Sequence, residues 1–364
     1  MKFLADELAA LESAHLRRSL RRHDDQPGRL IEVDGEKRIN FSSNNYLGLA
    51  QRPELVQAAR VALEMGTGST ASRLVTGNLG LHEDLEGTLA KFHRCEAVRL
   101  FNSGYQANIG LISALAGPGD LILSDRLNHA SVIDGCRLSK AEIRVYPHGD
   151  PQAVAAELKA SRSEGRRFVI SDSVFSMDGD IAPLRELRQV CDQYQAFLIV
   201  DEAHAVGALG PKGAGVCAMA GIRPDALVGG LGKSFGSLGG YVAGSGDLCE
   251  FLLNRARSFV FSTALPPAVV AASLAAVALA SESAGDELRA TLKDRMEQMR
   301  DGLQALSLLS SGAGQSPIFP ILTGSPARTL ECSQALLDRG FFCQAIRPPT
   351  VEEGKSRLRV ALSA

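Results

Sequence analysis

The residue with the clearest chemical signature is Lys233, which lies among glycines and small side chains in the segment GGLGKSFG (229–236). Such neighbours let another molecule approach the backbone closely, which a solvated surface lysine does not require. Asp201 precedes it along the chain and directly follows the apolar run AFLIV (196–200). A carboxylate at the end of a buried strand needs a partner, and a protonated ring nitrogen is a suitable one. The pairing predicts a lysine that forms a Schiff base and a carboxylate that faces a pyridinium nitrogen.

Polar side chains also follow other apolar runs of the chain. The segment NSGYQAN (102–108) follows one run and opens a helix, so its free N–H groups predict a site suited to a phosphate. His129, Asp172, Ser176 and His204 come after further runs. Because the carboxyl ends of parallel strands meet at one edge of a sheet, we expect these groups to converge there.

Each of these positions also has a purely structural explanation. Asp201 could cap a helix, His204 could be a satisfied buried side chain, and His129 could serve packing alone. Lys233 and its neighbours also match the end of the P-loop pattern G-x-x-x-x-G-K-[ST]. That pattern requires glycine at position 227, where this chain has Leu227 inside an apolar run, so a phosphate-cradling loop is excluded.

The composition is that of an ordinary soluble globular protein. The chain has 364 residues, of which 45% are hydrophobic and 22% charged, and its net charge of −2 gives no nucleic-acid or membrane-surface footprint. Seven dispersed cysteines without a C-x-x-C pair predict reduced thiols in a cytoplasmic protein, with neither a disulfide framework nor a metal site. The N-terminus shows no signal-peptide pattern, and the apolar stretch 264–280 is interpreted as a buried helix, so no membrane span is expected.

The predicted fold class is α/β. Residues 1 to about 25 predict a charged amphipathic helix, and an Asp-Gly pair predicts a hairpin over 30–36. Short apolar runs then alternate with helices, which predicts a mostly parallel sheet covered on both faces. After Pro267 the pattern predicts helices over about 267–282 and 286–306, followed by a smaller α/β part with strands at 318–321 and 357–360. The apolar runs are 97–101, 121–123, 143–145, 168–170, 197–200, 226–228 and 241–243.

The motifs resemble, in order and spacing, those of the pyridoxal-phosphate α-oxoamine synthases, which share the aminotransferase-like fold type I. The resemblance runs from about residue 15 to the last residue. It implies an N-terminal segment 1–48 that packs with the small domain, a large cofactor-binding domain 49–265 and a small C-terminal domain 266–364. The matching segments are 40–49, 77–86, 103–108, 125–131, 174–180, 200–204, 231–236, 261–267 and 345–350.

The resemblance also implies roles for individual residues in binding pyridoxal 5'-phosphate. Lys233 would hold the cofactor, Asp201 would pair with its ring nitrogen, and His129 would stack on the ring and assist catalysis. Cofactor contacts are further implied for Gly104 and Tyr105 at the phosphate, for Ser176 and His204 near the phenolic oxygen, and for Thr263 at the phosphate of the neighbouring subunit. The last contact implies a homodimer with the active site at the interface.

Substrate-binding roles fall to Arg347, whose guanidinium fork suits the carboxylate of an amino acid, and to Asn44 and Arg18. Arg17 and Arg21 are close enough to Arg18 to be alternatives for its role. The C-terminal segment is most similar to members that condense L-alanine with a pimeloyl thioester, carried by coenzyme A or an acyl carrier protein. Members that use glycine or serine with another acyl thioester are an alternative, and a non-catalytic partner subunit of the same fold is a weaker one.

Two departures from the family pattern affect these expectations. Members commonly have threonine or serine three residues before the lysine as a donor to the phosphate, and this chain has Gly230. We therefore expect weaker retention of the cofactor than in relatives. The sequence also ends at Ala364, where members continue into a closing helix, so that helix either lies beyond this sequence or is missing from the subfamily.

Overall fold

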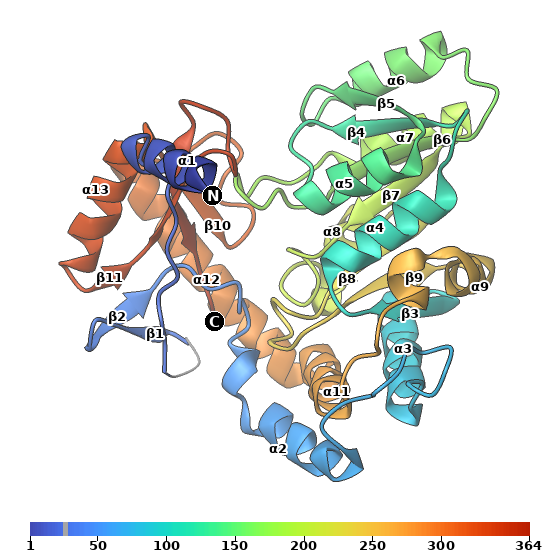
Figure 1. Cartoon of the computed structure of the whole chain (residues 1–364), viewed down its shortest axis with the longest axis horizontal. Helices are drawn as coiled ribbons and strands as arrows, with labels where there is room; N and C mark the ends of the chain where they lie inside the picture. Colours follow the sequence, from blue (N-terminus) through green and yellow to red (C-terminus); the bar gives the residue numbers. More distant parts are fainter. Residues whose placement is uncertain (25–27) are drawn as a thin grey trace. The chain divides into compact units, whose positions relative to one another are not determined.

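The computed structural model describes residues 1–24 and 28–364, which form two compact units (Figure 1). Unit 1 consists of 1–48, 177–180 and 292–364, and unit 2 consists of 49–176 and 181–291. The second boundary therefore lies after residue 291, not after the expected residue 265. Helix α11 accounts for the difference, because it packs against helices α2 and α3 of unit 2. These helices are α2 (Pro53–Ala62), α3 (Gly80–His93) and α11 (Pro267–Ser281).

Unit 2 is built on a seven-stranded sheet in the order β3-β9-β8-β7-β6-β4-β5. Strand β9 is antiparallel to both of its neighbours, and the other pairings are parallel. The mostly parallel sheet is thus confirmed, and each predicted apolar run is a strand. The strands are β3 (Ala97–Phe101), β4 (Leu121–Asp125), β5 (Glu142–Tyr146), β6 (Arg167–Asp172), β7 (Phe197–Asp201), β8 (Ala226–Gly230) and β9 (Gly240–Gly244).

Helices cover both faces of this sheet. On one face Phe168 and Ile199 belong to a core shared with α4, α5, α9 and α10. Alternate side chains of the same strands, such as Val169 and Leu198, point to the other face, where α7 lies along β7 and contacts α6 and α8. The helices are α4 (Gly104–Leu115), α5 (Ala130–Ser139), α6 (Pro151–Ala160), α7 (Leu184–Tyr194), α8 (Val216–Ala220), α9 (Gly246–Arg255) and α10 (Arg257–Val260).

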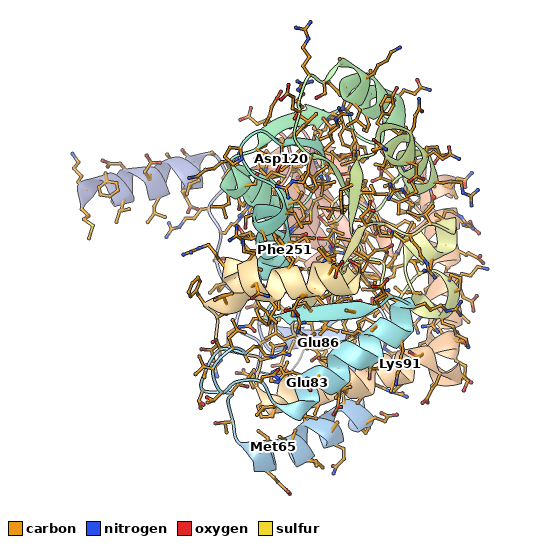
Figure 2. The ribbon with its side chains drawn as sticks, turned by 90° about the vertical axis from the view of Figure 1, so that its right-hand side faces the viewer. Met65, Glu83, Glu86, Lys91, Asp120 and Phe251 are labelled. Atoms are coloured by element: carbon orange, nitrogen blue, oxygen red, sulfur yellow. The ribbon has the colours of Figure 1, made fainter. Side chains whose placement is uncertain are left out.

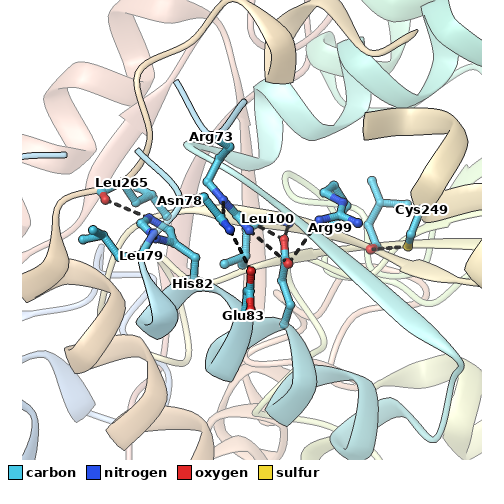
Figure 3. Close-up of polar contacts among 11 residues, drawn as sticks. Arg73, Asn78, Leu79, His82, Glu83, Arg99, Leu100, Cys249 and Leu265 are labelled. Carbon is cyan, nitrogen blue, oxygen red and sulfur yellow. Dashed lines mark hydrogen bonds and ion pairs between the residues drawn. The ribbon is translucent and has the colours of Figure 1, made fainter. Parts of the chain in front are cut away.

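A buried ionic cluster ties α3 to β3. The carboxylate of Glu86, a residue that Figure 2 labels on α3, accepts bonds from both terminal nitrogens of Arg73 at 3.0 and 3.1 Å. It also accepts from Arg99 at 3.2 Å and from the backbone N–H of Leu100 at 2.9 Å. Figure 3 labels Arg73, Arg99 and Leu100 of this cluster and marks its hydrogen bonds and ion pairs with dashed lines. Buried charges need such compensation, so the cluster fixes where α3 crosses the end strand of the sheet.

Unit 1 contains the predicted hairpin. Strands β1 (Leu30–Val33) and β2 (Glu36–Asn40) pair antiparallel, and both turn residues, Asp34 and Gly35, have positive φ of 53° and 77°. This is the geometry that an Asp-Gly turn favours. Strand β11 adds to β2 in parallel, and a second sheet has the order β10-β13-β12, with α13 packed on it. The remaining elements are β10 (Ile318–Gly324), α13 (Pro326–Leu337), β11 (Phe341–Phe342), β12 (Gln344–Ile346) and β13 (Ser356–Ala361).

The first helix is shorter than the sequence pattern predicts. Helix α1 spans Lys2–Ser13, and the predicted continuation to about residue 25 is wrong up to residue 24 and lies outside the described residues beyond it. His15 adopts the left-handed conformation with φ of 56°, and the N–H of Leu16 returns to the carbonyl of Leu11 at 2.8 Å. The N–H of His15 also donates to the carbonyl of Glu12 at 3.0 Å. The two bonds form a Schellman motif, which ends a helix at this point even without glycine.

The two predicted long helices are present as α11 and α12 (Ser283–Ala305). No single helix of the described residues is long and apolar enough to cross a membrane, although α11 and α12 together meet that test across a 75° bend. All seven cysteines are free thiols. In the described ranges, no group of three or more His, Cys, Asp or Glu could hold a metal ion. Short 3-10 helices lie at Leu49–Gln51, Leu63–Met65 and Pro211–Gly213.

Candidate active site

The site in unit 2 begins at two neighbouring strand ends. Asp172 ends β6 and Asp201 ends β7, and the two residues pair directly in the sheet register. Asp201 is buried, and its carboxylate accepts from the side-chain amide of Asn108 at 2.6 Å and from the N–H of Ala203 at 2.8 Å. The carboxylate is therefore held in one orientation at the carboxyl edge of the sheet, where a ligand is expected.

Asp172 is a second buried carboxyl group at this edge. One oxygen accepts from the backbone N–H of His129 at 3.2 Å, and the other has no hydrogen-bond partner in the described part of the chain. Burial, with repulsion from the neighbouring Asp201 adding to it, holds the pKa of Asp172 well above its usual range. This carboxyl group is consequently suited to carry a proton next to the fixed charge of Asp201.

His129 caps the N-terminus of α5. Its ring atom Nδ1 lies 2.7 Å from the hydroxyl of Ser131 and accepts the backbone N–H of Ser131 at 3.2 Å. Desolvation lowers the pKa of His129, and the Lys233 cation adds to this effect while the Asp201 charge opposes it. The structure thus places His129 within the electrostatic range of both the predicted lysine and the predicted carboxylate.

Lys233 lies in the connection between β8 and β9, which is a hairpin because these two strands are antiparallel neighbours. The connection is closed by bonds from Leu231 N–H to the Gly239 carbonyl at 3.0 Å and from Gly236 N–H to the Lys233 carbonyl at 2.9 Å. Gly236 has φ of 62°, and a Cβ there would lie 2.3 Å from the backbone nitrogen of Ala50. The glycine is therefore required by a close backbone contact that fixes the lysine loop.

The N-terminus of α4 forms the predicted anion site. Ser103 caps the helix by accepting the N–H of Gln106 at 3.1 Å. Gly240, the first residue of β9, lies against this turn, since a Cβ at Gly240 would be 2.5 Å from the nitrogen of Gly104. The missing side chain leaves the first N–H groups of the helix uncovered, as a bound phosphate requires. The phenol of Tyr105 donates to Asp134, so only the backbone of Tyr105 remains available for an anion.

His204 and Ser176 lie past the ends of β7 and β6, as the sequence predicts, with His204 buried and Ser176 half-buried. The turn that carries His204 is anchored by Glu202, which is completely buried. Its carboxylate accepts the N–H groups of Val216 and Cys217 at 2.9 and 2.6 Å. Burial raises the pKa of Glu202, and these hydrogen bonds oppose the rise.

Thr263 is exposed in a segment that other parts of unit 2 hold rigidly. It forms a backbone bridge with Ser72, and its carbonyl accepts from the side-chain amide of Asn102 at 2.6 Å. Two residues further along, the carbonyl of Leu265 accepts a hydrogen bond from the hydroxyl of Ser69 at 2.6 Å. The backbone of Thr263 is thus fixed, while its exposed side chain forms no hydrogen bond among the described residues.

The predicted substrate residues lie in unit 1. Arg347 is buried and donates to the carbonyl oxygens of His15 and Arg17. Arg18 donates to the hydroxyl of Thr350 at 2.9 Å. Burial and the neighbouring Arg18 cation lower the pKa of Arg347. Two positive charges from distant parts of the sequence therefore meet, and such a pair favours an anionic ligand.

The alternatives to Arg18 have other contacts. Arg17 pairs with Glu12 at 3.1 Å, and Arg21 lies over the ring of Phe342 at 5.7 Å. Of these three arginines, Arg18 is therefore the best candidate for the substrate-binding role beside Arg347.

The side-chain oxygen of Asn44 already accepts hydrogen bonds within unit 1. Its side-chain oxygen accepts from both terminal nitrogens of Arg359 at 3.1 Å and from the hydroxyl of Tyr46 at 3.2 Å. The amide NH₂ of Asn44 is the part that can serve a substrate, as a donor.

Sequence reasoning missed Asn108, Ser131 and Glu202. Asn108 lies one helical turn after Gly104, so its position on the inner side of α4 was a usable signal. Glu202 stands inside the motif DEAH, where its neighbours Asp201 and His204 drew the attention.

The groups present fit pyridoxal phosphate. Asp201 offers a fixed acceptor for a protonated ring nitrogen, the N-terminus of α4 offers uncovered N–H groups for a phosphate, and Lys233 offers an amine for the aldehyde.

Comparisons with known proteins identify the family of the chain. The family model for aminotransferase class I and II matches residues 36–364. The 8-amino-7-oxononanoate synthase of Citrifermentans bemidjiense is 47% identical over 366 residues, covering 100% of this chain and 94% of that protein. The structure of Sphingomonas wittichii serine palmitoyltransferase has a TM-score of 0.93 at 33% identity, covering 100% of this chain and 92% of that one. A structure of SPT with PLP also has a TM-score of 0.93, at 30% identity, with 99% and 92% covered.

Proposed function

The chain belongs to the aminotransferase class I and II family, and on that premise we propose that it is a pyridoxal-phosphate-dependent acyltransferase of biotin biosynthesis. It condenses L-alanine with a pimeloyl thioester and releases carbon dioxide, the free thiol and 8-amino-7-oxononanoate. The observation that carries the proposal is the 47% identity, along the whole chain, to a protein named for that product. Asp201, His129 and Lys233 supply the chemistry that such a condensation needs.

Pyridoxal phosphate, when bound, supplies an electron sink that stabilises negative charge at the Cα atom of the amino acid. Lys233 would hold the cofactor through its aldehyde group, and its free Nζ atom would be the base that takes the Cα proton of the amino acid. Asp201, fixed by Asn108 and Ala203, keeps the ring nitrogen protonated. His129 would stack on the ring.

The phosphate and the phenolic oxygen have separate binding groups. The N–H groups of Gly104 and Tyr105 bind the phosphate at the start of α4, with no hydroxyl from position 230. Ser176 and His204 contact the phenolic oxygen. Thr263 reaches the phosphate bound by a second copy of the chain, so the enzyme is a homodimer; the exposure of Thr263 on a fixed backbone supports this assignment.

Arg347 binds the carboxylate of L-alanine as a bidentate donor. Arg18 adds a second positive charge beside it, and the amide NH₂ of Asn44 donates to a substrate oxygen. Once the Cα proton has left, the Cα atom would attack the thioester carbonyl carbon. The C–S bond would then break, and the carrier, coenzyme A or an acyl carrier protein, would leave as a thiolate that takes up one proton.

The test combines cofactor spectroscopy with substrate choice. The purified chain with pyridoxal phosphate should show a visible absorbance band that Lys233→Ala abolishes, and L-alanine should change the band more strongly than glycine or serine. Turnover should then be highest with a pimeloyl thioester when compared with acetyl and palmitoyl thioesters. Preference for serine and a palmitoyl thioester would support the second candidate, a serine acyltransferase, which the structural likeness to serine palmitoyltransferase favours.

A further inference from the structure

A continuous series of hydrogen bonds links two of the predicted catalytic groups, Asp201 and His129. The Asn108 side-chain amide lies 2.6 Å from Asp201 and 2.9 Å from the hydroxyl of Ser131. The Ser131 hydroxyl in turn lies 2.7 Å from Nδ1 of His129. Asn108 and Ser131 are both almost completely buried, at 1% exposure each, so water does not compete for these bonds.

The donor and the acceptor of each hydrogen bond in this series follow from the carboxylate of Asp201 at one end. A carboxylate can only accept, so the group of Asn108 that faces Asp201 is its NH₂, which donates. The same NH₂ donates its second hydrogen to the Ser131 oxygen. Ser131 must then direct its single hydroxyl proton elsewhere, and Nδ1 of His129 is the group within reach. Nδ1 also receives the backbone N–H of Ser131, so it is an acceptor twice over.

We propose that Asn108 and Ser131 are positioning residues that hold the His129 imidazole as the tautomer with its proton on Nε2. The role rests on the proposed function, in which His129 lies against the cofactor ring. In this tautomer His129 presents a hydrogen-bond donor to the substrate and cannot act as a base through Nδ1. A donor N–H fits the carboxylate of the amino acid or the carbonyl oxygen of the thioester.

The open edge of the imidazole agrees with this role. His129 is exposed, and within the described ranges Nε2 has no hydrogen-bond partner. The charged groups that act on the ring are Asp201 from β7, Lys233 from the β8–β9 connection and Asp134 from α5. Asp172 from β6 holds the backbone of the same residue. The negative groups would favour a doubly protonated ring, and the hydroxyl bond to Nδ1 opposes that by favouring the neutral form.

Side-chain nitrogen NMR tests the proposal on the full chain with pyridoxal phosphate bound. With isotope-labelled histidine, the His129 signals are assigned by their loss in His129→Gln. The expected spectrum shows Nδ1 unprotonated and Nε2 protonated at neutral pH. Ser131→Ala should raise the pKa of His129 by about half a unit to one unit, because one hydrogen bond to the neutral ring is lost. Asn108→Leu should populate the opposite tautomer by freeing the Ser131 hydroxyl.

Ser139→Ala is the matched control, since Ser139 is a buried serine of the same helix whose hydroxyl bonds to the Cys136 carbonyl. It should leave the His129 signals unchanged. A His129 proton on Nδ1 in the unchanged protein, or a pKa unaffected by Ser131→Ala, would overturn the proposal. If Asn108→Leu fails to fold, the Ser131→Ala titration still decides.

The NMR result is independent of turnover. If no thioester is turned over while the tautomer is as expected, the proposed function fails and the positioning role of the two residues stands. If turnover is as proposed and the tautomer is not, only the positioning role fails.

Discussion

Replacing Gly230 with serine should tighten the binding of pyridoxal phosphate by about tenfold. Gly230 pairs with Gly240 across β8 and β9, and side chains of directly paired residues lie on the same face of a sheet. A Cβ at Gly240 would meet the nitrogen of Gly104 at the start of α4, so a hydroxyl at position 230 projects toward the same N–H groups. It would supply the phosphate donor that this chain lacks.

The magnitude follows from two opposing terms. A hydrogen bond to a charged group contributes about 1.5–3 kcal/mol. A Cβ at Gly230 would lie 3.2 Å from the Cβ of Ala203, so the Ala203 turn must move by a few tenths of an ångström, at a cost of about 1 kcal/mol, the low end for added side-chain volume. The net gain is about 0.5–2 kcal/mol, and each 1.4 kcal/mol is about a tenfold change in affinity.

The assay is a titration of cofactor-free protein with pyridoxal phosphate, followed by the visible absorbance of the bound cofactor. Gly230→Ala is the matched control, because it adds the same Cβ and meets the same Ala203 contact without a hydroxyl. The alanine variant should bind the cofactor no more tightly than the unchanged protein. Equal dissociation constants for the serine and alanine variants would refute the assignment of a missing phosphate contact to position 230.

Three further predictions concern other parts of the chain. Asp172→Asn should flatten the pH dependence of stability. Because the pKa of Asp172 is raised in the folded state, the unfolding free energy of the unchanged protein falls as pH rises above about 4. In urea unfolding, the stability of the variant relative to the unchanged protein should therefore increase toward neutral pH. Parallel pH profiles of the two unfolding free energies would contradict this. Glu86→Gln should lower the unfolding free energy by about 3 kcal/mol because two buried arginines lose their counter-charge, whereas Glu83→Gln on the exposed side of α3 should change it by less than about 0.5 kcal/mol. Arg347→Lys should raise the KM for L-alanine at least about tenfold with cofactor affinity unchanged, since lysine cannot bind a carboxylate as a fork; an equal loss of cofactor binding would instead indicate a structural role.

Local patterns were sufficient for most of the architecture. The apolar runs marked all seven strands of the large sheet. The central strands read as continuous hydrophobic segments because both of their faces are buried, whereas the edge strand β5 is mostly exposed. The Asp34-Gly35 turn was legible for a similar reason, since its backbone conformation favours those residue types. Lys233 and Asp201 were found because their chemical character conflicts with their surroundings.

Features that depend on tertiary contacts could not be predicted from the sequence. The end of α1 relies on a left-handed His15, a residue type that carries no stop signal. Helix α11 joins unit 2 through its packing on α2 and α3, which composition does not reveal. The bond between Asn108 and Asp201 joins residues far apart in the sequence, and only the folded sheet brings them together.

The hairpin that carries Lys233 has a consequence for how the enzyme assembles. Asp201, Asp172 and His129 are brought together by parallel strands, whose pairing closes long loops and therefore forms slowly. The lysine connection is closed by contacts between residues less than ten positions apart, from Leu231 to Gly239. Its loop-closure entropy is small, so this segment can order as soon as β8 and β9 meet. The loop of the nucleophile is consequently closed by the most local contacts of the site, while its contact with Ala50 and its electrostatic partners form only as the rest of the unit folds.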